Sequence, residues 1–231
     1  MIHQDTHIVF HFVRHGESEI NRRPSLIGGR SENTPLSERG VQQSIRLGQR
    51  LHAEGADIDM FFSSPLPRTI ETSHKICHEI RFPVEEIEVV EDLTELSQGR
   101  WEGADRSEIY SAEQLRYINT KGPLFTPPEG ESQRNVERRV SNWLEDRILF
   151  NQAFRQAKPV LNVMVVSHAL ALKCLFHYIL GFSDRLTYRV QLDNCSLSRF
   201  VFKKEGWFLH SLNDSYHLAG TGRSNGEYTG L

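Results

Sequence analysis

Ile8-Val9-Phe10-His11-Phe12-Val13 is followed directly by Arg14-His15-Gly16, and this stretch decides the fold. Its apolar, β-branched and aromatic residues predict a buried strand, which stops at the glycine. A buried strand that ends in charged side chains delivers them to the carboxyl edge of a sheet, where α/β proteins favour active sites. We therefore expect Arg14 and His15 to lie at such an edge.

The same order of a strand, polar residues and a helix occurs twice more. Residues 58–62 predict a second strand, and the helix expected over residues 66–80 carries Arg68 in its first turn. Residues 161–166 predict the most deeply buried strand, which leads through His168 into an apolar helix. Because the carboxyl ends of parallel strands converge on one crevice, we expect the two histidines and two arginines to meet there.

The remaining periodicities complete an α/β pattern. Further elements are predicted as a helix over residues 37–51, a strand over 87–90, a short helix near 106–118, a long amphipathic helix over 132–157, and closing strands within 188–212 around a turn at 204–206. Alternation of strands and helices predicts a three-layer α/β/α sandwich with a mostly parallel central sheet and one antiparallel strand. We expect one domain over residues 1–219, a lid-like insertion at about 97–131, and a loose tail over 220–231.

The composition excludes several classes of protein. The chain has 231 residues, and 27 basic against 30 acidic side chains give a formal net charge of −3, so it lacks the basic excess of a nucleic-acid or membrane-surface binder. Cys77, Cys174 and Cys195 are too few and too widely spaced for a disulfide framework or a cysteine zinc site. Met1 to Asp5 lacks the features of a secretory signal. We expect a cytoplasmic protein, and the sequence leaves a homodimer open.

Two histidines and two arginines at strand and helix ends suit a phosphoryl group, whose oxygens need fixed donors. Arginine offers a bidentate fork, and a neutral imidazole is a competent nucleophile for phosphorus. A carboxylic acid is then needed to protonate the departing oxygen and later to accept a proton from water. Several loop glutamates could serve: Glu95, Glu102, Glu129 and Glu131.

At these residues the chain resembles the histidine phosphatase superfamily, also called the phosphoglycerate mutase-like family. The blocks that carry the resemblance are Arg14-His15-Gly16-Glu17-Ser18 with Asn21, residues 29–40, Ser63-Ser64-Pro65-Leu66-Pro67-Arg68-Thr69 with Thr72, Leu93-Thr94-Glu95-Leu96 with Gly99, Trp101, Glu102 and Gly103, Pro128-Glu129-Gly130-Glu131-Ser132, and Val165-Val166-Ser167-His168. They follow the family order and span roughly residues 8 to 200, so the match is far more specific than any single motif.

The resemblance implies a role for each matched residue. His15 would be phosphorylated, and the phosphoryl oxygens would be held by Arg14, Asn21, Arg68 and His168. The catalytic acid falls on Glu95. Neither a metal nor a cofactor is implied; His3, His7 and His11 recur regularly but lack the carboxylates of a metal motif.

The chain departs from the family pattern after the second histidine. The family usually has Gly there and often Arg a few residues later, whereas this chain has Ala169 and Lys173. Ala169 would narrow the pocket slightly, and Lys173 keeps a positive charge without the fork of arginine. Other candidates for contact with substrate are Glu17, Ser18, Arg22, Arg23, Gly28 and Arg30.

We expect a metal-independent phosphatase that acts on a small phosphate monoester and releases inorganic phosphate. A mutase of the phosphoglycerate type is the first alternative; such mutases typically have Arg after the acid, whereas Leu96-Ser97-Gln98 follows Glu95 here. A non-catalytic module that binds phosphorylated ligands is the second. The loops at 22–34 and 97–131 would set the substrate, and their composition does not select one.

Overall fold

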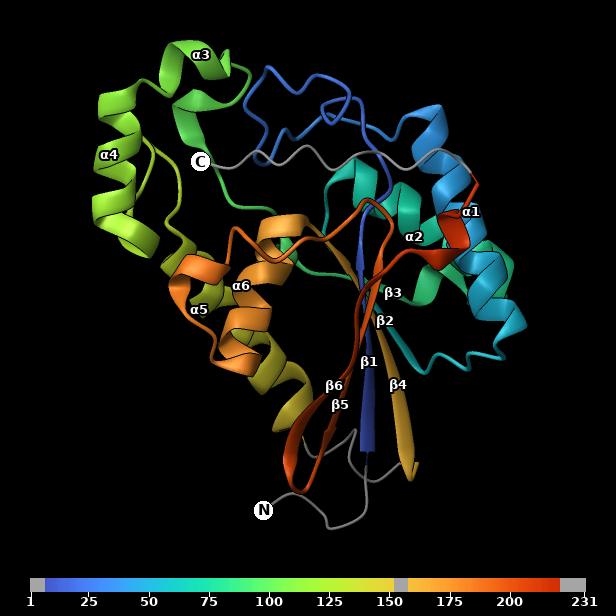
Figure 1. Cartoon of the computed structure of the whole chain (residues 1–231). Helices are drawn as coiled ribbons and strands as arrows, with labels where there is room; N and C mark the ends of the chain where they lie inside the picture. Colours follow the sequence, from blue (N-terminus) through green and yellow to red (C-terminus); the bar gives the residue numbers. More distant parts are fainter. Residues whose placement is uncertain (1–6, 152–157, 221–231) are drawn as a thin grey trace.

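The computed structural model describes residues 7–151 and 158–220, and these form one six-stranded sheet with helices on both faces (Figure 1). The strands lie in the order β3-β2-β4-β1-β5-β6. Their bounds are β1 His7–Arg14, β2 Met60–Ser63, β3 Ile87–Val89, β4 Val160–Ser167, β5 Leu197–Lys203 and β6 Gly206–Asp214. Strands β1 to β4 pair in parallel, and β5 runs antiparallel to both β1 and β6. The expected three-layer sandwich with one antiparallel strand is confirmed.

Two pairs of helices cover the two faces of the sheet (Figure 1). Helices α1 (Glu38–Ala53) and α2 (Pro67–Ile80) pack against each other on one face. Helices α5 (Gln133–Leu144) and α6 (Ala169–Leu180) pair on the other face. Ser37 begins α1 by accepting a hydrogen bond from the amide of Gly40, and Ser132 begins α5 in the same way.

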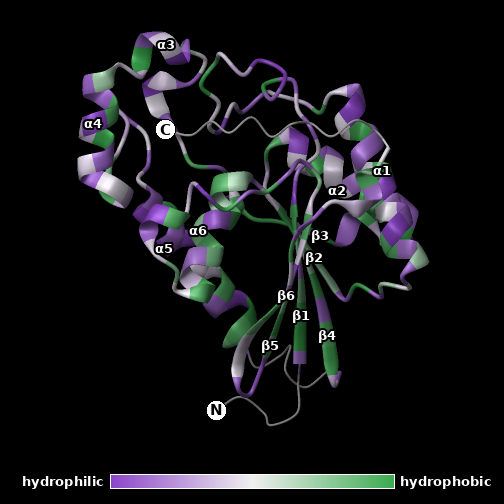
Figure 2. Ribbon diagram, in the orientation of Figure 1, coloured by the Kyte–Doolittle hydropathy of each residue, from purple (hydrophilic) through white to green (hydrophobic). Residues whose placement is uncertain are grey.

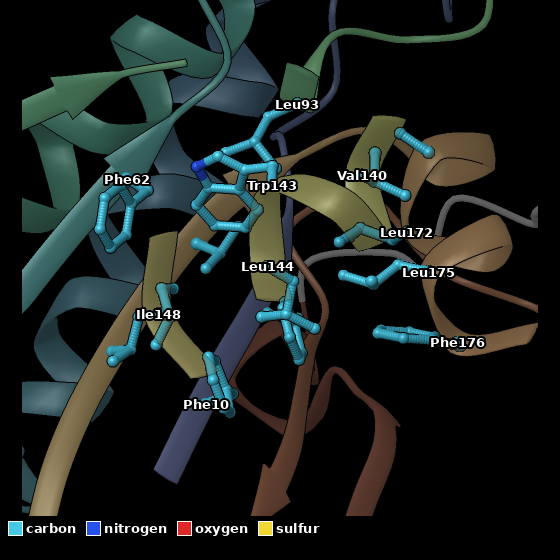
Figure 3. Close-up of a cluster of buried hydrophobic side chains, with 14 of the residues drawn as sticks. Phe10, Phe62, Leu93, Val140, Trp143, Leu144, Ile148, Leu172, Leu175 and Phe176 are labelled. Carbon is cyan, nitrogen blue, oxygen red and sulfur yellow. The ribbon is translucent and has the colours of Figure 1, made fainter. Parts of the chain in front are cut away.

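The sheet is buried on both faces because alternate residues of its central strands enter two different cores. Phe10 and Phe12 of β1 enter the core under α5 and α6, while Val13 enters the core under α1 and α2. Figure 2 shows the apolar strands at the centre and the polar faces of the helices turned outward. In the first core the side chains of α5, α6 and the strands interlock around Trp143 (Figure 3).

The segment expected as an insertion forms two short helices beyond the edge of the sandwich. Helices α3 (Arg106–Ile109) and α4 (Ala112–Lys121) replace the one short helix predicted over 106–118. Asp105 and Ser111 each accept an amide hydrogen bond at a helix start, and the second cap at Ser111 separates the two helices. The single-domain boundaries stay a prediction, and residues 221–231 of the expected tail lie outside the described residues.

Two elements differ from expectation. The long helix predicted to residue 157 ends at Leu144 and continues only as a wide turn over Glu145–Leu149, in which the amide of Phe150 donates to the carbonyl of Glu145 at 2.8 Å. The i to i+5 hydrogen bond makes this turn wider than an α-helix, and both Ile148 and Leu149 are buried in it. Residues 152–157 lie outside the described residues.

The closing strands begin later than predicted. Val190 and Leu192 lie in a loop, and the first closing strand starts only at Leu197. The reason is local: Cys195 adopts a left-handed backbone with φ of 58°, and its amide donates to the carbonyls of Arg14 and His15. The loop therefore closes the end of β1 instead of extending the sheet. No helix among the described residues is long and apolar enough to span a bilayer.

Phe200 tests the packing of the first core. Its side chain is fully buried, and its ring contacts the rings of Phe12, Phe176 and Trp207 at centroid distances of 4.8 to 6.4 Å. We expect Phe200→Ala to lower the free energy of unfolding by about 3–5 kcal/mol, measured by urea denaturation, because it removes apolar contacts and leaves a cavity. Leu124→Ala, at a side chain 67% exposed, is the control and should change it by less than about 0.5 kcal/mol.

Candidate active site

The two histidines meet because their strands are neighbours. His15 and His168 are the residues that follow β1 and β4, and these strands pair in parallel up to Arg14 opposite Ser167. The amide of His15 donates to the carbonyl of Ser167 at 3.0 Å, which extends the pairing by one step. The two imidazole rings then lie edge to face with centroids 5.1 Å apart. The expected convergence of these junctions is therefore present in the structure.

His15 is held as a neutral imidazole with one nitrogen facing an arginine. Its Nδ1 lies 2.6 Å from the carbonyl of Gly16, which can only accept, so the proton is assigned to Nδ1 and the lone pair to Nε2. Burial, and then the charges of Arg68 and Arg14, hold the pKa of His15 well below its usual value, while the bond to Gly16 opposes the shift. This is the form that a nucleophile requires.

The turn that carries His15 packs tightly on the start of α1. A Cβ on Gly16 would lie 2.5 Å from the carbonyl oxygen of Gly40, and a Cβ on Gly40 would lie 1.9 Å from that of Glu17. The amide of Gly16 donates to the hydroxyl of Thr72. The glycines therefore let the backbone after β1 pass close to the helix, and this fixes the position of His15.

Arg68 is a buried cation whose donors all point to oxygen or nitrogen acceptors. It lies in the first turn of α2, 2% exposed, and its Nε donates to Nε2 of His15 at 3.3 Å. Its terminal nitrogens donate to the carbonyls of Gly29, Arg30 and Ser31. Burial lowers the pKa of Arg68 to about 10, with Arg14 adding to the shift and Glu95 and Glu102 opposing it. Arg68 thus stays charged at neutral pH.

Glu102 holds the loop that positions Arg68. Its carboxylate accepts hydrogen bonds from the amides of Gln98, Arg30 and Ser31 at 2.9 to 3.0 Å. The same loop therefore presents its amides to Glu102 and its carbonyls to Arg68. From the sequence, Glu102 was considered only as an alternative to Glu95 as the catalytic acid. Its contacts instead show that it holds the loop that positions Arg68.

Arg14 and Asn21 both line a cavity next to the candidate site. Arg14 donates to the carbonyl of Leu192 at 2.6 Å, and burial lowers its pKa while Glu95 and Asp193 oppose the shift. Asn21 accepts with its Oδ1 from the amide and hydroxyl of Ser18 and from Nδ2 of Asn194. Asn21 can therefore turn its own amide nitrogen toward a ligand.

Asn194 and Ser64 were missed by the sequence-based reasoning. Asn194 is buried and donates to the carbonyl of His15 as well as to Asn21, so it ties the two residues together. Ser64 follows β2, and its hydroxyl lies 2.8 Å from Nε2 of His168. The signal for Ser64 was its place at a strand end, whereas the loop residue Asn194 carried no comparable signal.

His168 is fully buried, and one of its nitrogens is left without a partner. Its Nδ1 makes no hydrogen bond to any described residue, while Nε2 faces Ser64. Burial, then the charges of Arg68 and His15, keep its pKa well below the usual value. If the Ser64 hydroxyl donates to Nε2, the proton lies on Nδ1 and is available to an anion.

Glu95 lies at the amino end of α6, beside the two histidine-bearing strands. Its Oε1 accepts from the amides of Leu96 and Ala171 at 2.9 and 3.0 Å, and its Oε2 accepts from that of Leu170 at 3.2 Å. It opposes the pKa shifts of both Arg14 and Arg68 by its charge, which places it within electrostatic range of the phosphate-binding candidates. Oε2, with this single longer contact, is the less engaged of the two carboxylate oxygens.

The other candidates divide into two groups. Glu17, Asn21, Arg23, Gly28 and Ala169 line one cavity of about 1360 Å³. Ser18, Arg22 and Arg30 are not among its lining residues. Arg22 pairs with Glu19 and Arg30 with Glu131, while Ser18 is buried against Asn21. Ser18, Arg22 and Arg30 therefore make their contacts with other residues of the protein and not with the cavity.

Of the three amino-terminal histidines, His7 and His11 lie among the described residues. Within residues 7–151 and 158–220, no three His, Cys, Asp or Glu side chains gather in a way that could hold a metal ion. His3 lies outside the described residues. His11 is buried between Asn162 and Arg199, and burial lowers its pKa to about 4.

A family model described as the histidine phosphatase superfamily, branch 1, matches residues 10–215. The chain belongs to the histidine phosphatase superfamily. A relative from Yersinia pestis (strain Pestoides F), called probable phosphoglycerate mutase GpmB, is 31% identical over 219 residues, which cover 90% of this chain and 94% of that protein. The resemblance inferred from the sequence is thereby confirmed.

Solved structures of lower identity share the fold of this histidine phosphatase superfamily member. A putative alpha-ribazole-5'-P phosphatase from Escherichia coli is 23% identical with a TM-score of 0.75, covering 90% of this chain and 97% of that one. A phosphoserine phosphatase mutant from Entamoeba histolytica, in complex with phosphoserine, is 23% identical with a TM-score of 0.75 over 91% and 99% of the two chains. At these identities the likeness establishes the fold alone.

The lowered pKa of His15 can be tested directly in this superfamily member. Nitrogen chemical shifts of the free protein, assigned by comparison with His15→Ala, should keep the pattern of a neutral imidazole as the pH falls through 6.5. The sign follows from the environment, because burial and two cations make protonation of His15 harder, so it requires a lower pH. A titration midpoint at or above 6.5 would contradict this electrostatic account.

Glu102 offers a second test, because Glu102→Gln replaces one of its acceptor oxygens with a nitrogen that cannot accept. We expect the free energy of unfolding to fall by about 1–3 kcal/mol and competitive inhibition by inorganic phosphate to weaken on the order of tenfold, since the loop that orients Arg68 loosens. Glu108→Gln, at an exposed residue of α3, is the matched control. Loss of stability with unchanged phosphate affinity would show that Glu102 does not position Arg68.

Proposed function

We propose that the chain is a metal-independent phosphomonoesterase that forms a phosphohistidine on His15 and acts on a small phosphorylated metabolite. One observation carries the proposal: a buried, neutral His15 directs Nε2 toward a buried guanidinium, with Arg14 and a second histidine beside it. A nucleophile surrounded by fixed cationic and N–H donors suits an anionic, tetrahedral substrate.

In the first step, Nε2 of His15 attacks phosphorus as the bond from phosphorus to the ester oxygen breaks. A phosphoryl oxygen takes the place of His15 Nε2 as acceptor for Nε of Arg68, which frees the lone pair for attack. Arg14, Asn21, Arg68 and Nδ1 of His168 donate to the non-bridging oxygens. These donors are positioned before the substrate arrives, so little reorganisation is needed as charge moves during transfer.

Glu95 serves as the acid and then as the base. A proton on Oε2 passes to the departing ester oxygen, and the alcohol leaves. Glu95 then accepts a proton from water as the water oxygen attacks phosphorus and the bond between phosphorus and Nε2 breaks. Inorganic phosphate leaves, and His15 and Glu95 return to their starting protonation states. The amides of Leu170 and Ala171 hold the carboxylate in place through both steps.

Neither a metal nor a cofactor is needed in this scheme. Arg14 and Arg68 supply the positive charge that divalent cations supply in other phosphoryl-transfer enzymes. Each stays in place through backbone carbonyls, so neither is neutralised by a bound carboxylate. Their charge is thus available to the substrate.

A mutase of the phosphoglycerate type is the second candidate, and the 31% identical relative favours it. Both reactions pass through the phosphohistidine. The phosphoryl group is then transferred to water by the hydrolase and to a second hydroxyl group by the mutase. Leu96-Ser97-Gln98 after Glu95 supports the hydrolase, because no cation stands there to hold a carboxylated sugar acid.

The reaction class can be established by measuring inorganic phosphate release from a panel of monoesters in the presence of EDTA. The wild type should release phosphate, and His15→Ala should lose at least about three orders of magnitude in rate because the nucleophile is gone. His78→Ala, at an exposed histidine of α2, is the matched control and should retain wild-type activity.

Three results would overturn the hydrolase. Interconversion of phosphoglycerates faster than phosphate release would identify a mutase. Binding of phosphate esters without turnover would identify a binding module. Equal activity in wild type and His15→Ala would remove the phosphohistidine from the mechanism.

A further inference from the structure

The acid segment, residues 92–97, carries Glu95 and lies mostly outside regular secondary structure. Its first two residues end a 3₁₀ turn over Glu91–Leu93, and residues 95–97 form neither a helix nor a strand. A segment of this kind moves more easily than the end of a strand unless other groups hold its backbone. Because a general acid must lie within hydrogen-bond reach of the departing oxygen, the position of this backbone matters to the proposed reaction.

Arg139 of α5 holds the acid segment at two points. Its Nη1 donates to the carbonyl of Asp92 at 2.6 Å, and its Nη2 donates to the carbonyl of Glu95 at 3.2 Å. The rigid fork of one guanidinium thus connects two carbonyls that lie three residues apart in the chain. Between them, Leu93 enters the same core as Trp143 of α5 (Figure 3). Helix α5 therefore supports this segment through both packing and hydrogen bonds.

Glu131 holds Arg139 and the far end of the acid segment. Its two carboxylate oxygens accept from Nε and Nη2 of Arg139 at 3.0 and 3.1 Å, which is a bidentate pair. Its Oε2 also accepts from the amide of Ser97 at 3.1 Å, and its own amide donates to the carbonyl of Ser97 at 2.9 Å. The segment is thus fixed at residues 92 and 95 by Arg139 and at residue 97 by Glu131.

The pair of Arg139 and Glu131 is largely removed from water, since the two side chains are 15% and 19% exposed. Burial raises the pKa of Glu131, but the hydrogen bonds and charge of Arg139, the amide of Ser97 and the charge of Arg30 lower it overall. An exposed ion pair contributes little to stability, whereas a bidentate pair with further backbone partners also fixes geometry. The pair is therefore suited to hold a backbone in one position.

Arg139 is separate from the space for a substrate. It is not among the residues that line the cavity beside Arg14. Among the described residues, its guanidinium donates only to Asp92, Glu95 and Glu131. An effect of Arg139 on the chemistry must therefore pass through other groups of the protein.

We propose that Arg139 is a positioning residue for the general acid: by holding the carbonyls of Asp92 and Glu95, it keeps the Glu95 carboxyl group in place to protonate the departing oxygen. The inference rests on the proposed phosphatase function and adds to it a residue outside the cavity. It also gives Glu131 a function, since its bidentate contact orients Arg139.

The charge of Arg139 offers a second route into the site. It adds to the lowering of the pKa of His168, after burial and the charges of Arg68 and His15. An effect through His168 would act on the transferred phosphoryl group, whereas an effect through Glu95 would act on the departing oxygen. Esters that differ only in their departing oxygen therefore distinguish the two routes.

Two nitroaromatic esters provide this comparison. 4-Nitrophenyl phosphate releases a phenolate that leaves without a proton, whereas 4-nitrobenzyl phosphate releases an alkoxide that must be protonated. For each ester, kcat/KM reports the steps up to phosphorylation of His15, so hydrolysis of the phosphohistidine does not enter the comparison. Both values come from one enzyme preparation, so the fraction of folded protein cancels in their ratio.

Arg139→Met should lower kcat/KM for 4-nitrobenzyl phosphate by about tenfold to a hundredfold and for 4-nitrophenyl phosphate by less than about threefold, because only the first ester needs the acid. Glu95→Gln should show the same selectivity more strongly. Arg138→Met, at the exposed neighbouring arginine of α5, is the matched control and should leave both values near those of the wild type.

The double variant tests whether Arg139 acts through Glu95. In the Glu95→Gln background, Arg139→Met should lower kcat/KM for 4-nitrobenzyl phosphate by less than about threefold, because the group that Arg139 positions is already lost. Glu131→Gln breaks half of the bidentate pair and should lower the ratio of the benzyl to the phenyl value by a smaller factor. If Arg139→Met does not fold, Glu131→Gln takes its place in both comparisons.

The outcomes separate the positioning role from the phosphatase function. Equal losses on both esters in Arg139→Met, or a full further loss in the Glu95→Gln background, would contradict the positioning role and leave the phosphatase function standing. Equal losses on both esters in Glu95→Gln would show that Glu95 is not the acid, and the positioning role would fail with that assignment. If the wild type hydrolyses neither ester, nor any monoester of the broader panel, the phosphatase function itself is wrong.

Discussion

The parallel pairing of β1 with β4 is the constraint on which the site depends. Phe10 lies opposite Val163 and Phe12 opposite Val165, and all four side chains enter the same core. Because side chains alternate between faces, a slip of one residue would move this apolar set out of its core. The register is thus fixed by burial, and it makes each strand end one residue before a histidine. The two histidines are therefore positioned by the hydrophobic packing of the strands that precede them.

The second requirement is to bury positive charge without neutralising it. A buried guanidinium is costly unless its donors are satisfied, and a carboxylate directly bound to it would cancel the charge that a phosphate needs. In this site backbone carbonyls accept from the terminal nitrogens of Arg68 and from one terminal nitrogen of Arg14, whose buried Nε has no partner among the described residues. Glu95 and Glu102 act on Arg68 from farther away. The result is a fixed positive region beside a cavity. Burial, and then the charges of Arg68 and Arg14, keep the pKa of His15 well below its usual value.

The sequence correctly predicted those elements for which the local residue pattern favours the same structure as the tertiary packing. The strands before His15 and His168 and the capped helix after Ser37 are of this kind. The end of α5 was mispredicted because the helix widens after Leu144 into a turn closed by an i to i+5 hydrogen bond, a change that the spacing of apolar residues does not reveal. The loop around Cys195 was assigned to a strand because its β-forming neighbours hide a left-handed residue that bonds to the end of β1. Long-range backbone contacts of this type leave no periodic signal.

The same distinction explains why catalytic candidates were easier to find than substrate contacts. His15, Arg68 and His168 follow regular elements, so pattern and topology bring them together. The cavity wall instead combines α4 with two irregular loops, and whether a cation there is free depends on which carboxylates others have taken. Arg30 and Arg189 are both loop arginines, yet Glu131 occupies the first and no described residue pairs with the second. Whether a loop cation is paired therefore depends on contacts between distant segments, which the local sequence pattern does not show.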